Sequence, residues 1–521
     1  MRRGLSLSII LVLALASACT SAPTPNAAGQ PNNTAIVLAE PSEPATLNPL
    51  AGYAPDGAAQ IFDGLLEHQS DGSLAAVLAN AMPKVSADSR SWTITIRGGI
   101  TFSDGSPFGV ADVVATYRAL LDPTVDSPLR TRYAMVTGVT QTGPNTVRFD
   151  LAYPYPAFPN LLTLGILPAA ALATPTPVGS MAVDTKPIGT GPYVLSSWTR
   201  GEQLVLSANS RYPAVLGGVP TVRTVTVRFV ADDATRAMLL KENLLDGAAV
   251  APSQAAQYAN STIFSVLNDP ASDLRAIEMP ANGPVTGDPT IRLALNYAVD
   301  RAALVSGPLA GQGSAASTPM PGVLPEFVDT ASTYSHDPTH AVDLLNAAGW
   351  QPGPDGVRTR DGVTASFTLD YPTGDTLDAE LANEFASDAK AVGISVRTVA
   401  IATTAAGAGS AADATLISFG NPFDPDLALY PLLDTALAGA NPGVANALNS
   451  AREQIDPAQR DVAYRQFQQS YLLSPTMVCL VLADHTYLMR NNWNGYEQVT
   501  DDTSQDVTWG AWWNLGTWTP R

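Results

Sequence analysis

The chain has 521 residues, more than one hydrophobic core can organise, because single cores stop growing at roughly 250–300 residues. Hydrophobic residues make up 45% and charged residues 14% of the sequence, which suits a folded globular protein and excludes wholesale disorder. The formal net charge of -19 repels phosphate backbones, so we expect no nucleic-acid partner. We expect two lobes, or two lobes with an inserted subdomain.

The first nineteen residues have the layout of an export signal. Two arginines open it, and the apolar run that follows, residues 5–16, is too short to span a bilayer. Small residues then precede Cys19, as in lipoproteins whose cysteine thiol receives a diacylglycerol, although Ala16 stands where leucine is usual. We expect lipidation at Cys19. The alternative is ordinary cleavage nearby, which would release the protein from the cell.

Residues 20–33 are rich in Pro, Ala, Asn and Ser, lack apolar periodicity and predict a flexible stalk. The folded body is expected to begin near Thr34. No later run of the sequence is apolar and long enough to cross a membrane. The protein is therefore expected to be exported and held by its lipid on the outer face of the cytoplasmic membrane, in the periplasm or cell-wall space.

Strands and helices alternate irregularly along the body. Period-two or short apolar patterns predict strands at 35–39, 92–96, 147–151 and 225–229. Apolar spacing predicts a helix over 111–121, and two further helices begin after the capping pairs Asp288-Pro289 and Asp337-Pro338, the second ending at Gly349. Without regular βαβ spacing, this order predicts an α/β architecture with a mixed sheet.

Signatures of catalysis are absent from the sequence. It contains no Gly-x-Ser-x-Gly elbow, no Walker loop and no Gly-x-Gly-x-x-Gly motif, so we expect no enzyme and no cofactor. His336 and His340 are four apart, as in some metal sites, but His336 precedes the predicted cap and no metal site is expected. Cys479 lies in an apolar run and is expected to be a buried small hydrophobe.

The stretch 402–414 consists of Thr, Ala, Gly, Ser and Asp. Such low complexity predicts a surface loop, and a functional lid is the alternative.

Six motifs in a fixed order resemble the family 5 solute-binding proteins, the oligopeptide, dipeptide and nickel binders. Each motif alone is weak, but their shared order and spacing carry the resemblance across nearly all of residues 35–521. They are Glu-Pro-Ala-Thr-Leu-Asn-Pro at 43–49 with Phe-Asp-Gly-Leu at 62–65, the Arg-Gly-Gly to Asp-Gly-Ser-Pro stretch at 97–107, Ala-Asp-Val-Val at 111–114, Gly-Thr-Gly-Pro-Tyr at 189–193, the helix at 291–301, and the helix at 336–350 ending in Ala-Gly-Trp.

The resemblance implies the two-lobed α/β periplasmic-binding-protein fold of type II, in its large peptide-binder subclass, with mixed sheets and an extra subdomain. The implied first lobe comprises residues 34–52, 180–275 and 479–521, the extra subdomain 53–179, and the second lobe 276–478. The implied function is capture of a short peptide between the lobes and delivery to an ABC permease with cytoplasmic ATPases. Lobe closure around the ligand is the expected two-state element, and the protein is expected to be a monomer.

The resemblance also implies two segments of the ligand site. The first is Glu43, Pro44, Ala45 and Thr46, and the second comprises Phe419, Gly420, Asn421, Phe423 and Asp424. Peptide binders of this family carry an Asp three residues before the acidic residue of an acid-proline pair, where it binds the peptide's α-amino group. Asn421 stands at that place here, so recognition of a free amine is not expected to depend on a carboxylate. Asp424 has a structural alternative as a helix cap ahead of Pro425.

Two other readings of the sequence stay open. A non-peptide ligand such as haem, a metal chelate or a cell-wall fragment would use the same fold. A regulatory or scaffold lipoprotein could have kept the fold and lost import.

Overall fold

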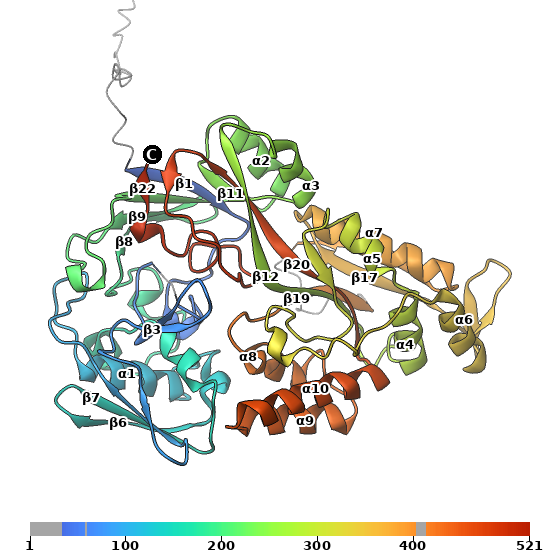
Figure 1. Ribbon diagram of the computed structural model, residues 1–521, viewed down its shortest axis with the longest axis horizontal. Helices are drawn as coiled ribbons and strands as arrows, with labels where there is room; N and C mark the ends of the chain where they lie inside the picture. Colours follow the sequence, from blue (N-terminus) through green and yellow to red (C-terminus); the bar gives the residue numbers. More distant parts are fainter. Residues whose placement is uncertain (1–33, 58–59, 403–412) are drawn as a thin grey trace, which may run out of the picture. The chain divides into compact units, whose positions relative to one another are not determined.

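The computed structural model describes residues 34–57, 60–402 and 413–521 (Figure 1). The predicted export signal, Cys19 and the stalk lie outside the described residues, as do residues 403–412 of the predicted loop. The body, Thr34–Arg521, forms one compact unit.

One large mixed sheet runs through this body. Among the described residues it has eleven strands, ordered β18-β17-β19-β12-β20-β11-β1-β10-β9-β8, with β13 paired to β20. Its strands are β1 (Ala35–Glu40), β8 (Tyr193–Thr199), β9 (Gln203–Ala208), β10 (Thr224–Phe229), β11 (Gly247–Ala249), β12 (Phe264–Glu278), β13 (Gly313–Ala315), β17 (Ser366–Pro372), β18 (Ser395–Ile401), β19 (Ala414–Phe419) and β20 (Met477–Arg490). The pairs β1–β10, β1–β11, β17–β18 and β17–β19 are parallel, and the other pairs are antiparallel. The mixed sheet predicted from the sequence is confirmed.

The two longest strands, β12 and β20, lie at the middle of the sheet and pair with each other along most of their lengths. At one end β20 pairs with β11, and at the other β12 pairs with β19. The β12–β20 register shifts between Asp269 and Asp273, and Ala271 there bridges to Asp501 instead. These strands therefore connect the two halves of the sheet, with a break in the ladder near their middle.

The buried apolar side chains form separate clusters on the two halves. We call lobe I the part whose core lies between Ile36 and Phe264 and between Tyr487 and Trp518. Lobe II has its core between Leu274 and Ala483. The alternation along β20 shows why lobe II has two cores, because Val478 and Leu480 face one cluster while Met477 and Cys479 face the other.

Helices cover both faces of the lobe II sheet. The first cluster is built with α4 (Pro289–Ala298), α5 (Arg301–Ser306), α6 (Pro338–Ala347) and α7 (Thr376–Ala391). The second is built with α8 (Pro425–Leu429), α9 (Pro442–Glu453) and α10 (Pro457–Leu473). In lobe I, α2 (Asp233–Lys241) packs on β11 and α3 (Pro252–Ala255) packs on β20.

A smaller sheet follows the first strand in sequence. Its order is β4-β5-β7-β6, from β4 (Lys84–Val85), β5 (Ser91–Thr95), β6 (Val136–Gly143) and β7 (Thr146–Leu151), with α1 (Val110–Leu121) packed on it. The short strands outside both sheets are β2 (Leu66–His68) with β3 (Leu74–Ala76), β14 (Gln351–Pro352) with β15 (Arg358–Arg360) and β16 (Val363–Thr364), and β21 (Trp493–Asn494) with β22 (Thr519–Pro520). The placement of the smaller sheet agrees with an extra subdomain, whose limits of 53–179 stay a prediction.

The elements predicted from local patterns form within a residue or two of their expected limits. The predicted strands correspond to β1, β5, β7 and β10, and the predicted helices to α1, α4 and α6. Asp288 and Asp337 cap their helices by accepting from the backbone N–H of Thr290 and His340. His336 lies before α6, and the ring of His340 packs edge-on against Tyr297. Cys479 is a buried free thiol whose pKa burial raises to about 12, as expected for a small hydrophobe.

Candidate functional site

The segment after β19 forms a tight turn against the break in β12. A Cβ at Gly420 would lie 1.6 Å from the backbone oxygen of Ser272, so the close approach requires glycine. Asn421 is buried, and its Oδ1 accepts from the backbone N–H of Phe423 at 3.0 Å and of Asp424 at 3.2 Å. The backbone of the turn therefore holds the side chain of Asn421 in place.

Asp424 has a structural role. Its Oδ1 accepts from the N–H of Asp426 at 2.9 Å and caps α8, with Pro425 at the first helical position. Two nitrogens of Arg460 donate to its two oxygens at 2.8 and 2.7 Å. Since both groups are buried, this bidentate pair neutralises the carboxylate in place. The helix-cap alternative raised from the sequence is confirmed.

Lobe II contacts the smaller subdomain through two ion-pairing residues that follow this turn. The hydroxyl of Tyr155 donates to Oδ2 of Asp426 at 2.6 Å. Arg452 donates from Nε to the hydroxyl of Tyr153 at 3.1 Å and lies 3.5 Å over the ring of Tyr430. Burial raises the pKa of Asp426 to about 6, although Arg452 lowers it in part.

Aromatic rings extend the same contact. His68 at the end of β2 stacks on Phe423 with ring centroids 3.3 Å apart, and Trp509 meets Phe423 edge-on at 5.1 Å. Burial lowers the pKa of His68, although its contacts with Asn160 and Asp56 oppose this in part. The ring nitrogens of His68 contact the backbone oxygen of Asp56 and the side-chain oxygen of Asn160. Beside His68, Asp56 forms an ion pair with Arg132.

Facing surfaces of the two lobes therefore each carry a guanidinium, a carboxylate and aromatic rings. Leu427 of α8 also packs against the core of lobe I. A surface of this composition can pair with a charged group of a ligand and stack against its apolar groups.

The predicted residues Glu43–Thr46 lie elsewhere in lobe I. The two oxygens of Glu43 accept from Nε1 of Trp198 at 2.8 Å and from the N–H of Gly201 at 2.9 Å. The backbone oxygens of Pro44 and Ala45 accept from Arg200, and Thr46 donates to Asp184. These contacts hold the first segment on the β8–β9 hairpin, whereas the 419–424 segment contacts β12, His68 and Trp509. The two predicted groups thus have different neighbours, and a ligand role for either stays a prediction.

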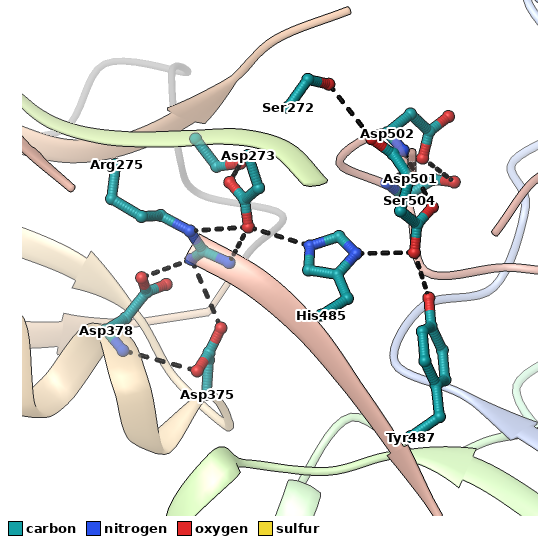
Figure 2. Close-up of polar contacts among 11 residues, drawn as sticks. Ser272, Asp273, Arg275, Asp375, Asp378, His485, Tyr487, Asp501, Asp502 and Ser504 are labelled. Carbon is teal, nitrogen blue, oxygen red and sulfur yellow. Dashed lines mark hydrogen bonds and ion pairs between the residues drawn. The ribbon is translucent and has the colours of Figure 1, made fainter. Parts of the chain in front are cut away.

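A buried polar network, shown in Figure 2, joins the strands between the lobes. Nδ1 of His485 on β20 contacts Oδ2 of Asp501 at 2.8 Å, and Nε2 contacts Oδ2 of Asp273 at 3.2 Å. Burial by itself would lower the pKa of His485, but the two carboxylates raise it to about 10. His485 is therefore a cation between two anions. The hydroxyl of Tyr487 also donates to Asp501.

Arg275 extends the network into lobe II. It donates to Asp273 at 2.6 Å, to Asp378 of α7 at 2.5 Å and to Asp375 at 3.3 Å. Burial opposes the charged form of Asp273, but Arg275 and His485 hold its pKa well below the usual range. The sequence analysis missed this network. Its signal was the presence of charged residues in segments predicted to be buried, Asp273 and Arg275 in β12 and His485 in the largely apolar β20, because buried charges require partners.

Carboxylates also gather beside the network at the end of β1. Glu40 accepts from the N–H of Val507 at 2.7 Å, and burial, together with Asp506, raises the pKa of Glu40 well above its usual value. Burial and the neighbouring Asp501 and Asp506 raise the pKa of Asp502 to about 8. Within the described ranges, no group of three or more His, Cys, Asp or Glu is arranged to hold a metal ion.

Comparison with known proteins identifies the family. The model described as "Bacterial extracellular solute-binding proteins, family 5 Middle" matches residues 73–439, which is more than half of the chain. The chain belongs to this family. Family 5 solute-binding proteins are the ligand-capturing components of ABC importers and are not enzymes, which agrees with the prediction from the sequence.

Individual relatives agree with the family match. This family 5 protein is 39% identical over 469 residues to Protein XP55 of Streptomyces lividans, covering 88% of this chain and 85% of that one. It is 33% identical over 311 residues to the glutathione-binding protein GsiB of Salmonella typhimurium, over 58% of each chain.

A solved structure confirms the fold. NikZ from Campylobacter jejuni, solved with Ni(L-His), is 26% identical and superposes with a TM-score of 0.84 over 94% of this chain and 99% of NikZ. The predicted two-lobed α/β fold of type II with a mixed sheet is therefore confirmed for this family 5 protein. Among its described residues, no helix is long and apolar enough to cross a membrane.

Proposed function

We propose that this protein is a lipid-anchored receptor that captures short peptides between its lobes and delivers them to an ABC permease. The observation that carries the peptide assignment is the pairing of charges on the facing surfaces, Asp56 with Arg132 on lobe I and Asp426 with Arg452 on lobe II. The C-terminal carboxylate of a peptide can pair with either guanidinium, and its apolar side chains can lie against the aromatic rings of both surfaces.

The relatives support this ligand class. GsiB is named for glutathione, a tripeptide, and 33% identity makes it informative about ligand chemistry. A metal chelate is the second candidate, because NikZ was solved with Ni(L-His). His68 is the histidine nearest the turn, but both its nitrogens already have partners, so ligating a metal would break one of those contacts. Peptide capture is therefore the better-supported proposal.

Native mass spectrometry of the purified protein tests the assignment directly. Short peptides should co-purify with it, because a closed two-lobed receptor releases its ligand slowly. The matched control is protein unfolded in guanidine, stripped by dialysis and refolded, which should lose the bound masses and regain them on adding the released fraction. Recovery of haem or a nickel chelate in place of peptides would contradict the proposal.

Binding should depend little on a free peptide N-terminus. The carbonyl of Asn421 serves its own turn, and Asp424 is neutralised by Arg460, so the predicted segment offers no free carboxylate to an ammonium group. Calorimetry with the recovered peptide and its N-acetylated twin should show a loss of affinity near tenfold or less, about 1.4 kcal/mol. A loss of a hundredfold or more would show that a carboxylate still holds the amine.

The matched variant for that comparison is Asn421→Asp. An aspartate can accept the same two backbone N–H groups and adds a negative charge. It should strengthen binding of the free-amine peptide through a charge-assisted bond and leave the acetylated peptide no better. Equal gains for both peptides would show that the substitution acts on the turn and not on the amine.

Membrane attachment should require the cysteine at the end of the export signal. Cys19→Ser should release the protein from the membrane, because a serine hydroxyl cannot form the thioether that carries the lipid. Detergent phase partitioning measures this, with Ser17→Ala as a control that keeps the thiol. Unchanged partitioning of the serine variant would contradict lipid anchoring while leaving peptide capture standing.

A further inference from the structure

A cavity lies within lobe I, apart from the contact between the lobes. Its volume is about 570 Å³, and its described lining residues all fall within 57–221 or 497–517. These ranges contribute nothing to the cores of lobe II, which lie between Leu274 and Ala483. The volume is that of a small-molecule site, since ligand pockets commonly measure about 300–1,000 Å³.

The walls of this cavity carry carboxyl groups and no cationic side chain among the described residues. Asp63, Glu67 and Glu497 line it, and the described lining residues include no Lys, Arg or His. Glu67 accepts from Gln69 at 3.1 Å. Burial raises the pKa of Asp63 to about 7 and raises that of Glu67, because neither carboxylate has a cation beside it to offset the desolvation. A cation in the cavity would supply that missing charge.

Two polar groups in the same wall lack hydrogen-bond partners among the described residues. Asp63 is only 8% exposed, and its Oδ1 accepts from the hydroxyl of Tyr212 at 3.3 Å while its buried Oδ2 has no partner. The buried Nε1 of Trp513 is also without one. Since an unsatisfied buried group costs free energy, an unpaired acceptor and an unpaired donor in one wall point to a ligand that offers the complementary pair.

Aromatic surface accompanies the carboxylates. Phe62, Tyr212 and Trp513 all line the cavity. Aromatic faces attract organic cations through their quadrupoles, most strongly when the cation is partly desolvated. Carboxylates together with aromatic faces favour an ammonium or guanidinium group over a strongly hydrated inorganic cation.

We propose that this cavity is a second binding site, for a small organic cation that also carries an oxygen acceptor. The cation lies against Asp63, Glu67 and the aromatic faces, and the oxygen accepts from Nε1 of Trp513. The site is independent of peptide capture, because it lies within lobe I alone. The ring of Trp513 is 5.5 Å from that of Trp509, which contacts Phe423 of lobe II, so the site adjoins the lobe contact without being part of it.

Calorimetry with three cations and one neutral isostere tests the site. Choline, ethanolamine and tyramine, each an organic cation with an oxygen, are the probes, and 3,3-dimethylbutan-1-ol replaces the quaternary nitrogen of choline by carbon at the same shape. At least one cation should bind with a dissociation constant below 1 mM, roughly the −4 kcal/mol that marks weak specific binding. The neutral alcohol should bind at least tenfold more weakly than choline. Failure of all three cations to bind, or equal binding of choline and its isostere, would overturn the proposal.

Variants locate the binding. Asp63→Asn and Glu67→Gln should each lower the affinity for the cation at least tenfold. The Glu67→Gln variant keeps the test valid if the buried Asp63 is needed for folding. The matched control is Asp71→Asn, because Asp71 is an exposed carboxylate in the turn between β2 and β3 and does not line the cavity. Equal weakening by all three substitutions would indicate general electrostatics and no site.

Competition separates this site from the peptide site. Saturating the protein with its co-purifying peptide should leave the cation affinity within twofold, and Glu67→Gln should leave peptide affinity unchanged. Displacement of the cation by the peptide would place it between the lobes and overturn the second site. If the wild-type protein binds the cation but no peptide, peptide capture is refuted and the second site stands.

Discussion

Replacing Arg275 by methionine should lower the free energy of unfolding by about 3–5 kcal/mol, because the buried Asp378 loses its cation and the buried Asp273 keeps only His485. Arg275 is 8% exposed and pairs with Asp273 and Asp378, which are 0% and 3% exposed. Methionine keeps much of the side-chain volume, so the loss reports on charge and not on a cavity. Urea unfolding followed by tryptophan fluorescence measures the effect.

The matched control is Arg148→Met on β7. Arg148 pairs with Asp150 at 3.0 Å, but their side chains are 45% and 37% exposed. Exposed ion pairs contribute about 0–1 kcal/mol, so this variant should unfold almost as the wild type does. Adding Asp378→Asn to Arg275→Met should recover part of the loss by removing one unpaired charge. Equal destabilisation by the two arginine variants would contradict a special role for the network.

The protein should lose stability as the pH rises from 5 to 9. Burial raises the pKa of Asp63 and Asp269 to about 7 and, with neighbouring carboxylates, that of Asp502 to about 8. Each folded pKa lies above the unfolded value of about 3.9, so between those values the native state binds more protons than the unfolded chain. Stability from these groups is therefore lost on going up in pH.

His485 acts in the same direction over a higher range. Burial would lower its pKa, but Asp501 and Asp273 raise it to about 10, above the unfolded value of about 6.5. Its contribution is complete below about pH 6.5 and is lost as the pH approaches 10, by up to about 1.4 kcal/mol per pH unit for the one proton involved. The depressed pKa of Asp273 acts oppositely, but only at acidic pH below the unfolded value of about 3.9.

Thermal midpoints at constant ionic strength measure this pH dependence. His485→Gln should flatten the decline above pH 7, and Asp502→Asn should flatten it below pH 8. Asp104→Asn is the control, because Asp104 is exposed and hydrogen bonds from Ser106 lower its pKa, so it titrates outside this window. A midpoint that rises between pH 5 and 9 would contradict the buried carboxylates and the charged histidine.

Local chemistry made part of this structure predictable. Asp288, Asp337 and Asp424 each precede a proline at the first helical position, and each caps its helix as expected. Strands with one buried face were also predicted from their sequence, because apolar and polar residues alternate along them. Such features depend on neighbours a few residues away, which a single sequence displays.

Long-range partners were not predictable from the sequence. His485 contacts Asp273, 212 residues away, and Asp501, 16 residues away. Glu43 contacts Trp198, 155 residues away, and thereby belongs to a hairpin. A local sequence pattern does not identify the distant residue that pairs with a buried charge. The family resemblance, and no local pattern, placed Glu43 and Asn421 in one site; their described neighbours differ, and a ligand role for either stays a prediction.

The discontinuity of lobe I affects the order in which the chain can fold. Its core needs Tyr487, Trp512 and Trp518, which are made after all of the core residues of lobe II. Domains usually fold in the order in which they are synthesised. Here the half of the protein that starts first must wait for residues beyond 487, while lobe II, from Leu274 to Ala483, has its own cores complete in one continuous stretch. We therefore expect lobe II to fold first during synthesis. Lobe I can complete its core only after the end of β20 and the aromatic residues that follow it have been synthesised.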